Sequence, residues 1–487
     1  MNLTWLVGTP LLGAAVILWL PRNATRQIRA VATLATLVAF AISVGLAARM
    51  PWHQDALQFV ERHAWIPPAN IWYHLGVDGI SMPLVLLTTL LSVLACCASF
   101  GITERVKEYF VLYLLLETGM LGTFVAMDLF LFYVFWEVVL VPMYFLIGIW
   151  GGGRREYSAM KFFLYTLAGS LAMLLAILAV FLHAGTFDIA ALGARSGHDF
   201  TLGLQRWLFL AFFFAFAIKV PIFPFHTWLP DAHVDAPTPI SVLLAGVLLK
   251  MGGYGFYRIG FPFFPQAVRQ FLPALAILGA VNIVYGALVA MAQTDFKRMV
   301  AYSSVSHMGF VLLGLASMTD AGFQGGLLQM VSHGLVTGGM FLLVGVLYDR
   351  THTRDLTAFG GLSARVPRYA GILTFFSLAS LGLPALSGFV GEFLALLGSL
   401  PTHPLVTSIS VVGIVLAAGY TLLMLQRVLL GPLNPQWSAL PDVTARELTT
   451  LLPLLFLVVA LGVYPWWLLQ GQAASVAHLL QLLRLAP

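Results

Sequence analysis

Apolar segments of about 20 residues recur from one end of this 487-residue chain to the other. A helix of that length crosses the ~30 Å hydrocarbon layer of a membrane. We predict about fourteen such spans, at 3–20, 28–48, 79–100, 109–127, 129–150, 159–183, 207–228, 238–259, 271–292, 299–318, 323–347, 370–398, 405–429 and 448–469. Because a helix satisfies its own backbone groups inside lipid, the predicted fold class is an all-α polytopic membrane protein.

The composition excludes a sizeable soluble domain. Hydrophobic residues make up 60% of the chain and charged residues only 9%, whereas a soluble domain carries about 25% charged residues. The expected partner is therefore the lipid bilayer. The net charge of +5 comes from arginines in loops, so we expect no nucleic-acid partner. The first apolar segment has neither a basic start nor a clear A-x-A cleavage site, so we interpret it as a retained span.

Cysteine use and motif content argue against a cofactor in this chain. The only two cysteines, Cys96 and Cys97, are adjacent within one span, which supports neither an iron–sulfur cluster nor a disulfide framework. The chain also has no GxGxxG, P-loop or HExxH motif. We therefore expect no redox cofactor, nucleotide or catalytic metal here.

Lysines and arginines predict the orientation, because they favour cytoplasmic loops. With the N-terminus outside, sixteen of the 25 basic residues fall in inside loops, Lys161 and Lys297 among them. Seven fall in outside loops: Arg49, Arg62, Arg195, Arg206, Arg258, Arg269 and Arg484. The other two, Lys219 and Lys250, lie within spans. Both termini are therefore predicted to lie outside.

Two predicted spans are interrupted. "AFAIKVPIFPFHTWLPDAH" (215–233) contains Pro221 and Pro224, and "SLGLPALSGFVGEF" (380–393) contains glycines and Pro384. Proline removes a helical hydrogen bond and pushes away the carbonyl four residues back. Paired broken helices are typical of inverted-repeat transporters and their ion sites, and irregular backbone at this depth must line protein or water. The alternative is a packing kink in an ordinary bundle helix.

Ionisable side chains lie near the middle of several spans, where each charge costs roughly 2.5–3.5 kcal/mol. The ionisable row, as we call this set, comprises Glu137, Lys219, Lys250, His307, His333 and Glu392. Two alternatives stay open. The histidines could be hydrogen-bonded core residues, and Glu137 with Lys219 could be a structural salt bridge, although buried ion pairs add little stability.

The spacing and chemistry of the ionisable row favour proton transfer. Glu137 and Lys219 are 82 positions apart, and His307 and Glu392 are 85 apart, so each half offers one group on a middle span and one at a break. A carboxylate ~4 Å from an ammonium stabilises it by about 4 kcal/mol at an effective dielectric near 20, and lysine deprotonates readily when desolvated. A Glu–Lys pair beside Lys and His relays therefore acts as a charge-controlled proton switch.

Four further residues are secondary candidates. Glu117 is deep enough in its span to be a secondary site, whereas Asp128 could simply cap the next helix. His226 and Asp231 follow the first break, together with His233. These three could suggest a metal, but they lack a tight ligand pattern. We favour a cytoplasmic proton entrance or a loop-ordering role for them.

Four long motifs carry a resemblance over nearly the whole chain. "FWEVVLVPMYFLIGIWGG", "KVPIFPFHTWLPDAHVDAPTPISVLLAGVLLKMGGYG", "KRMVAYSSVSHMGF" and "GFVGEF" resemble the antiporter-like M-type subunits of complex I, the proton-pumping NADH:quinone oxidoreductase. The resemblance implies fourteen helices, with helices 1–3 at 1–108, inverted five-helix repeats at 109–259 and 271–429, and helix 14 with a tail at 430–487. It also implies roles: Glu137 as gating carboxylate, Lys219 as its partner, Lys250 as central relay, His307 and His333 as connecting groups, and Glu392 as terminal site.

The resemblance also implies partners and a location. Other subunits, including neighbouring antiporter-like ones, would carry NADH, FMN, iron–sulfur clusters and quinone, while this chain moves protons in the bacterial cytoplasmic membrane. Subunits of Mrp sodium/proton antiporters are similar, but Glu392 and "VPMYFLIGIWGG" favour the redox complex. Ferredoxin-dependent photosynthetic relatives of thylakoid membranes share "FHTWLPDAH" and stay an alternative. A third possibility is a membrane enzyme or scaffold that uses the histidines as ligands.

Overall fold

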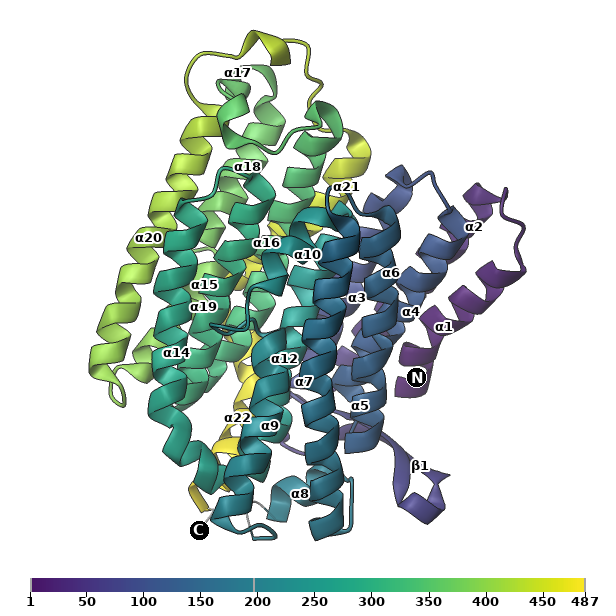
Figure 1. Ribbon diagram of the computed structural model, residues 1–487, viewed down its shortest axis with the longest axis vertical. Coiled ribbons are helices and arrows are strands. Elements are labelled where there is room, and N and C mark those ends of the chain that lie inside the picture. The colour runs from purple at the N-terminus through teal and green to yellow at the C-terminus, as the bar shows by residue number, and fades with distance from the viewer. Residues whose placement is uncertain (1, 196–197, 486–487) are drawn as a thin grey trace.

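The predicted spans fold as helices that run roughly along one common direction (Figure 1). The computed structural model describes residues 2–195 and 198–485. Within these residues, twelve helices are long and apolar enough to cross a membrane. The shorter α1 (Leu3–Trp19) and the broken pair α18–α19 occupy the positions of the other two predicted spans. The prediction of an all-α polytopic membrane fold is confirmed.

The N-terminal helices form one edge of the molecule (Figure 1). After α1 come α2 (Thr25–Ala47) and α3 (Ser81–Ala98), the latter ending in the short turn η2 (Ser99–Gly101). Between them lies an antiparallel hairpin, β1 (Gln58–Ile66) and β2 (Ile71–Val77), joined by the 3-10 turn η1 (Pro67–Ala69). The hairpin was not predicted. Thr4 at the start of α1 hydrogen-bonds Glu61 of β1, so the hairpin lies beside the N-terminus.

The first half of the core contains two helix interruptions. Its elements are α4 (Val106–Val125), α5 (Leu129–Val138), α6 (Leu140–Trp150), α7 (Arg155–Ala184), α8 (Ile189–Arg195), α9 (Leu202–Lys219) and α10 (Trp228–Asp235). The predicted break is confirmed, because α9 ends at Lys219 and the chain is irregular up to α10. A second break, between α5 and α6, was not predicted. It lies just after Glu137. Pro142 is four residues after Val138, so in a continuous helix the proline ring would clash with the Val138 carbonyl.

One central helix follows, and protein surrounds it. It consists of α11 (Thr238–Leu243), the π-helical η3 (Leu244–Leu248), α12 (Leu249–Gly255), the π-helical η4 (Phe256–Gly260) and α13 (Phe261–Phe263). Its apolar stretch is completely buried, and α3, α9 and α16 pack against it. A π turn interrupts the regular backbone ladder and is often found at functional sites.

The second half also consists of long helices, and the broken pair α18–α19 matches the predicted break of the first half. Its elements are α14 (Pro265–Met291), α15 (Phe296–Ala316), α16 (Asp320–Thr351), η5 (Leu356–Ala358), α17 (Leu362–Arg365), α18 (Pro367–Ser380), α19 (Ser387–Ser399) and α20 (Pro404–Leu429). The predicted break between α18 and α19 is confirmed, and Gly382 (φ +81°) and Ala385 (φ +72°) take the left-handed turn that separates them. The buried α16 contacts both α15 and α19.

The C-terminal region holds one more helix than predicted. After the turn η6 (Pro435–Trp437), α21 (Ala445–Val463) occupies the fourteenth predicted span but ends six residues early, just before Pro465. Helix α22 (Trp466–Leu485) was predicted only as a tail. Its Ser475 accepts a hydrogen bond from the backbone of Gly79 at the start of α3. Both chain ends lie toward the end of the molecule that carries the hairpin and α8 (Figure 1).

Each half of the molecule contains one antiparallel backbone bridge, and the two bridges lie toward opposite ends of the molecule. Asp128 pairs with Asp188, and Asp295 pairs with Asp355, both as antiparallel bridges. Each residue of the second pair lies 167 positions after its counterpart in the first. The first bridge lies next to α8 and the second next to α17, and Figure 1 shows α8 and α17 at opposite ends. This arrangement supports the prediction of two inverted repeats.

Candidate proton-relay site

Lys250 lies on α12 between the two π-helical segments of the central helix. Its Nζ donates to the carbonyl of Ala245 at 2.5 Å and lies 2.6 Å from Nδ1 of His333 on α16. When Lys250 is protonated it can only donate, so Nδ1 of His333 then accepts and the ring proton of the neutral imidazole is on Nε2. The structure therefore joins Lys250 and His333, both members of the predicted ionisable row, in one direct contact.

His307 and Glu392 form a second joined pair. Nδ1 of His307 on α15 lies 2.7 Å from Oε1 of Glu392 on α19. Nε2 of the same ring lies 3.2 Å from Oγ of Ser380 and 3.3 Å from the hydroxyl of Tyr420. All four side chains converge where the α18–α19 break opens the backbone. The sequence predicted His307 and Glu392, but not Ser380 or Tyr420, which carry no charge and so gave no signal.

A small polar cavity separates the two pairs. It measures about 10 Å³, and its lining includes His307, Gln329, His333, Ser380 and Glu392. That volume is at the lower limit of what holds one water. The rings of His333 and His307 are 5.8 Å apart, and Nε2 of His333 has no hydrogen-bond partner among the described residues. The two histidines therefore border the same small cavity.

Lys219 is the last residue of α9 and is buried among aromatic rings. Its Nζ lies 5.3 Å from the ring centroid of Trp136 and 5.6 Å from that of Phe162, both within cation–π range. Among the described ion pairs, none joins Lys219 to Glu137 within 4.0 Å. The assumed ~4 Å ion pair is therefore wrong for this structure, because Trp136 and Phe162 hold the ammonium instead.

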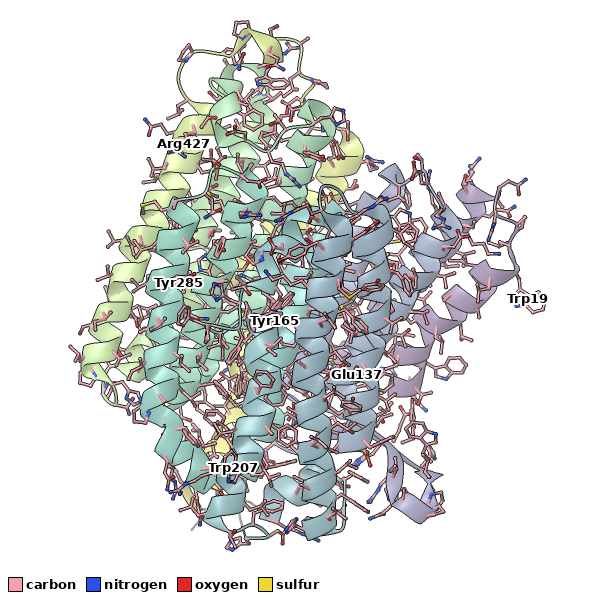
Figure 2. The ribbon with its side chains drawn as sticks, viewed as in Figure 1. Trp19, Glu137, Tyr165, Trp207, Tyr285 and Arg427 are labelled. Carbon is pink, nitrogen blue, oxygen red and sulfur yellow. The ribbon has the colours of Figure 1, made fainter. Side chains whose placement is uncertain are left out.

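Glu137 lies near the end of α5 and is only half-buried. Ser170 of α7 supplies a hydroxyl beside its carboxylate, and Lys219 contributes a more distant positive charge. Figure 2 shows Glu137 at mid-height, between Trp207 toward the lower end and Arg427 toward the upper end. Glu137 and Lys219 are therefore near enough to interact electrostatically without direct contact.

Asn282 of α14 completes the hydrogen bonds of the break behind Lys219. Its amide oxygen accepts from the backbone N–H of Phe223 at 2.8 Å, and its amide nitrogen donates to the carbonyl of Pro221 at 3.2 Å. Proline-rich backbone thus remains satisfied at membrane depth. On the other side, a Cβ on Gly252 would lie only 2.9 Å from Cβ of Lys219, so glycine lets α12 approach α9 closely.

The secondary candidates have different outcomes. Glu117 is completely buried on α4 beside Ser92 of α3, which is not part of the ionisable row. Asp128 caps α5, because its carboxylate accepts from the backbone N–H groups of Phe130 and Leu131, and also from that of Trp72. Burial raises the pKa of Asp128, and these hydrogen bonds partly offset the increase. The structure supports the capping interpretation of Asp128.

The three polar residues after the first break do not cluster. Asp231 pairs with Lys161 of α7 at 2.7 Å and with Arg298 of α15 at 3.5 Å, which fits a loop-ordering role. The ring of His226 packs against those of its aromatic neighbours, and the ring of His233 stacks on Phe341 at 4.5 Å. Within the described residues, no group of three or more His, Cys, Asp or Glu side chains could hold a metal ion.

Lys297 is one of several basic residues, Arg258 of the central helix among them, that the sequence assigned to loops but that lie on helices. It was assigned to a loop, but it lies at the start of α15, is buried, and donates from Nζ to the carbonyl of Ala236 at 2.5 Å. It borders a cavity of about 440 Å³ that also contacts Asp235, Asp349 and Arg354. Lys161 was also assigned to a loop but belongs to α7. In both cases the helix extends beyond the apolar stretch that hydropathy detects.

Comparison with known proteins places this geometry in one family. The family model described as "NADH:quinone oxidoreductase/Mrp antiporter, TM" matches residues 126–417, which include the whole ionisable row. The NADH-quinone oxidoreductase subunit M of Rhodobacter capsulatus is 47% identical over 490 residues, covering 97% of this chain and 95% of that protein.

Two solved structures share the fold over nearly the full length. A chain of respiratory complex I from Thermus thermophilus with bound NADH matches with a TM-score of 0.91 and 33% identity, covering 99% of each chain. A chain of the Mrp complex from Dietzia sp. DQ12-45-1b matches with a TM-score of 0.87 and 23% identity, covering 99% of this chain and 98% of that one. The second likeness concerns the fold alone. This chain belongs to the family of NADH:quinone oxidoreductase and Mrp antiporter transmembrane subunits.

Proposed function

We propose that this chain is the proton-translocating membrane subunit of a respiratory complex I, and that it couples NADH:quinone electron transfer to proton pumping. The observation that carries the proposal is the buried series Lys250, His333, the small polar cavity, His307 and Glu392. Structural needs alone seldom place so many ionisable groups in line at this depth, because each costs free energy in lipid. The names of the subunit M relative and of the complex I structure support the same assignment.

The geometry supports a direct proton path along the second half. When Lys250 is protonated, its ammonium donates to Nδ1 of His333, so a proton accepted there displaces the one on Nε2, which has no hydrogen-bond partner among the described residues. Across the cavity, His307 shares a hydrogen bond with Glu392 through Nδ1. Imidazole suits this step because its two nitrogens can take up and release a proton on opposite sides of the ring.

The first half supports a charge-controlled switch. In this structure, the ammonium of Lys219 rests over aromatic rings while Glu137 is half-buried beside Ser170. A charge change next to Glu137 alters the attraction on Lys219, since Coulomb energy at short range in a protein is about 4 kcal/mol. We infer that Lys219 moves between the rings and the carboxylate as Glu137 changes protonation state.

The wider setting is part of the proposal. Other membrane-arm subunits, including neighbouring antiporter-like ones, would adjoin this chain, and FMN, iron–sulfur clusters and quinone would belong to other subunits. The membrane would be the bacterial cytoplasmic membrane, with both termini outside. The two bridges 167 residues apart support the division into inverted repeats at 109–259 and 271–429.

An Mrp-type antiporter subunit is the second candidate, supported by the shared fold of the Dietzia chain. The higher identity of the Rhodobacter relative favours the redox complex. Purification of the intact complex separates the candidates: flavin and iron–sulfur clusters in co-purified hydrophilic subunits support complex I. Co-purification with small antiporter subunits and no redox centre would instead support Mrp, and ferredoxin as electron donor would support a photosynthetic relative.

Substitutions in the assembled complex test the mechanism. We expect Lys219→Ala and Glu137→Ala to reduce redox-driven proton pumping sharply in sealed membrane vesicles while the complex still assembles. Lys107→Ala is a matched control, because Lys107 donates to the carbonyls of Leu18 and Leu20 near the end of α1, away from the ionisable row. Normal pumping in assembled Lys219→Ala or Glu137→Ala complexes would refute the proposed function.

A further inference from the structure

The terminal carboxylate has a second hydrogen-bond donor besides His307. Nε2 of Gln329 donates to Oε1 of Glu392 at 3.0 Å, the same oxygen that lies 2.7 Å from Nδ1 of His307. Gln329 is almost completely buried on α16, four residues before His333. Residues at that spacing share one helix face, so α16 presents an amide to Glu392 and an imidazole to the cavity.

Close packing of two helices holds the amide in place. A Cβ on Gly391 would lie 2.6 Å from Oε1 of Gln329 and 2.8 Å from its Cα. Glycine at this position therefore lets α19 lie directly against α16. The amide oxygen has no hydrogen-bond partner among the described residues, so the N–H bond to Glu392 is the polar contact that orients this side chain.

The amide affects the two protonation states of Glu392 unequally. A hydrogen bond to a carboxylate is roughly twice as strong as one to a neutral acceptor, so an N–H donor favours the ionised form. We propose that Gln329 is a positioning residue of the terminal proton site, which keeps the proton shared by His307 and Glu392 on His307. The proposal rests on the proposed function, because it concerns a step of the same relay.

Gln329 and His307, rather than the other groups around Glu392, favour the ionised carboxylate. His307 comes from α15, His333 faces Glu392 from α16 across the cavity, and Tyr420 comes from α20. Helix α18 contributes the hydroxyl of Ser380. Neutral Gln329 stabilises the carboxylate without adding a charge that would compete for the proton.

The test replaces the amide by an apolar side chain of similar length. In the intact complex, Gln329→Met removes the donor but keeps the volume. NADH-driven pumping in sealed vesicles is then measured against pH. We expect the acidic limb of the profile to move to higher pH by about one to two units, the size of a lost hydrogen bond to a charged group. Gln329→Glu, whose carboxylate repels that of Glu392, should move it at least as far.

Two controls separate this role from packing. Ser399→Ala removes another hydrogen bond between α19 and its neighbour, from Oγ to the carbonyl of Leu313 at 3.0 Å, and lies two turns from Glu392; its acidic limb should stay in place. An unshifted limb in assembled Gln329→Met and Gln329→Glu complexes would overturn the inference. Glu392→Gln tests the proposed function separately, because full pumping there would contradict the relay itself.

Discussion

Trp136 is expected to control how strongly Lys219 is attracted to Glu137. The ammonium lies 5.3 Å from the Trp136 ring and 5.6 Å from the Phe162 ring, at a site that is 2% exposed. A desolvated cation–π contact of this kind contributes about 2 kcal/mol, and tryptophan provides the strongest one. Losing one ring therefore raises the equilibrium ratio of ammonium paired with Glu137 to ammonium over the rings by roughly 30-fold, since each 1.4 kcal/mol is a factor of ten.

A graded series of substitutions measures this effect. Trp136→Phe keeps a weaker aromatic face, so pumping should fall only about fivefold or less for a loss of ~1 kcal/mol. Trp136→Leu removes the face, so pumping should fall by about tenfold or more, because the ammonium stays paired with Glu137. The assay is NADH-driven proton uptake into sealed vesicles, with NADH oxidation by an artificial acceptor as the measure of assembly.

Phe132→Leu is the matched control for the loss of a buried aromatic ring. The Phe132 ring lies 5.6 Å from that of Trp136 and is completely buried, but the cation–π contacts of Lys219 are with Trp136 and Phe162. If Trp136→Leu pumps as well as Phe132→Leu at equal assembly, the cation–π account of Lys219 is wrong.

Three further predictions concern other parts of the molecule. Lys250→Met should lower pumping by about 10²-fold or more, because Nδ1 of His333 loses the group that donates to it; pumping above half of wild type would contradict this. Arg258→Ala should cost about 3–5 kcal/mol, since it leaves the buried Asp78 carboxylate without its partner at 2.7 Å, and Asp78→Asn in the same chain should restore thermal stability in detergent. Burial alone would raise the pKa of Asp188, but the His74 ring, whose Nδ1 lies 3.3 Å from Oδ2, the N–H of Ala191 and the charge of Arg62 outweigh it and hold that pKa below its usual value. Because the folded-state pKa is depressed, Asp188 stabilises the hairpin above the unfolded-state pKa of about 4 and loses this effect as pH falls further; hydrogen exchange in β2 should accelerate there in wild type, and Asp188→Asn should lack the acid-dependent change.

The sequence predicted features that depend on local pattern. The spans follow from apolar length, and the breaks at Lys219 and before Glu392 follow from proline and glycine. The pairs Lys250–His333 and His307–Glu392 come from residues 83 and 85 positions apart. Intramembrane charge marked them as functional candidates, but only tertiary packing could reveal which of them are in contact.

The features that the sequence missed depend on long-range contacts. Strand β1 of the hairpin is mostly exposed and β2 is mostly buried, so neither strand shows the alternating pattern that predicts a strand from sequence. Gln329, Ser380 and Tyr420 carry no charge, so their value lies in the partners that the fold brings to them. The aromatic contacts of Lys219 were hidden for the same reason, because Trp136 and Phe162 look like ordinary core residues in a sequence this apolar.

The two bridges 167 residues apart allow the two ends of the molecule to be compared within one protein. The Asp128–Asp188 bridge lies next to α8 and the Asp295–Asp355 bridge lies toward α17, at opposite ends of the molecule, so a bilayer around the long helices would separate the two bridges. In a sealed vesicle, a reagent or acid pulse added from one side therefore reaches one bridge first and leaves its counterpart untouched. The same substitution made at both positions thus reports the sidedness of a perturbation within a single molecule.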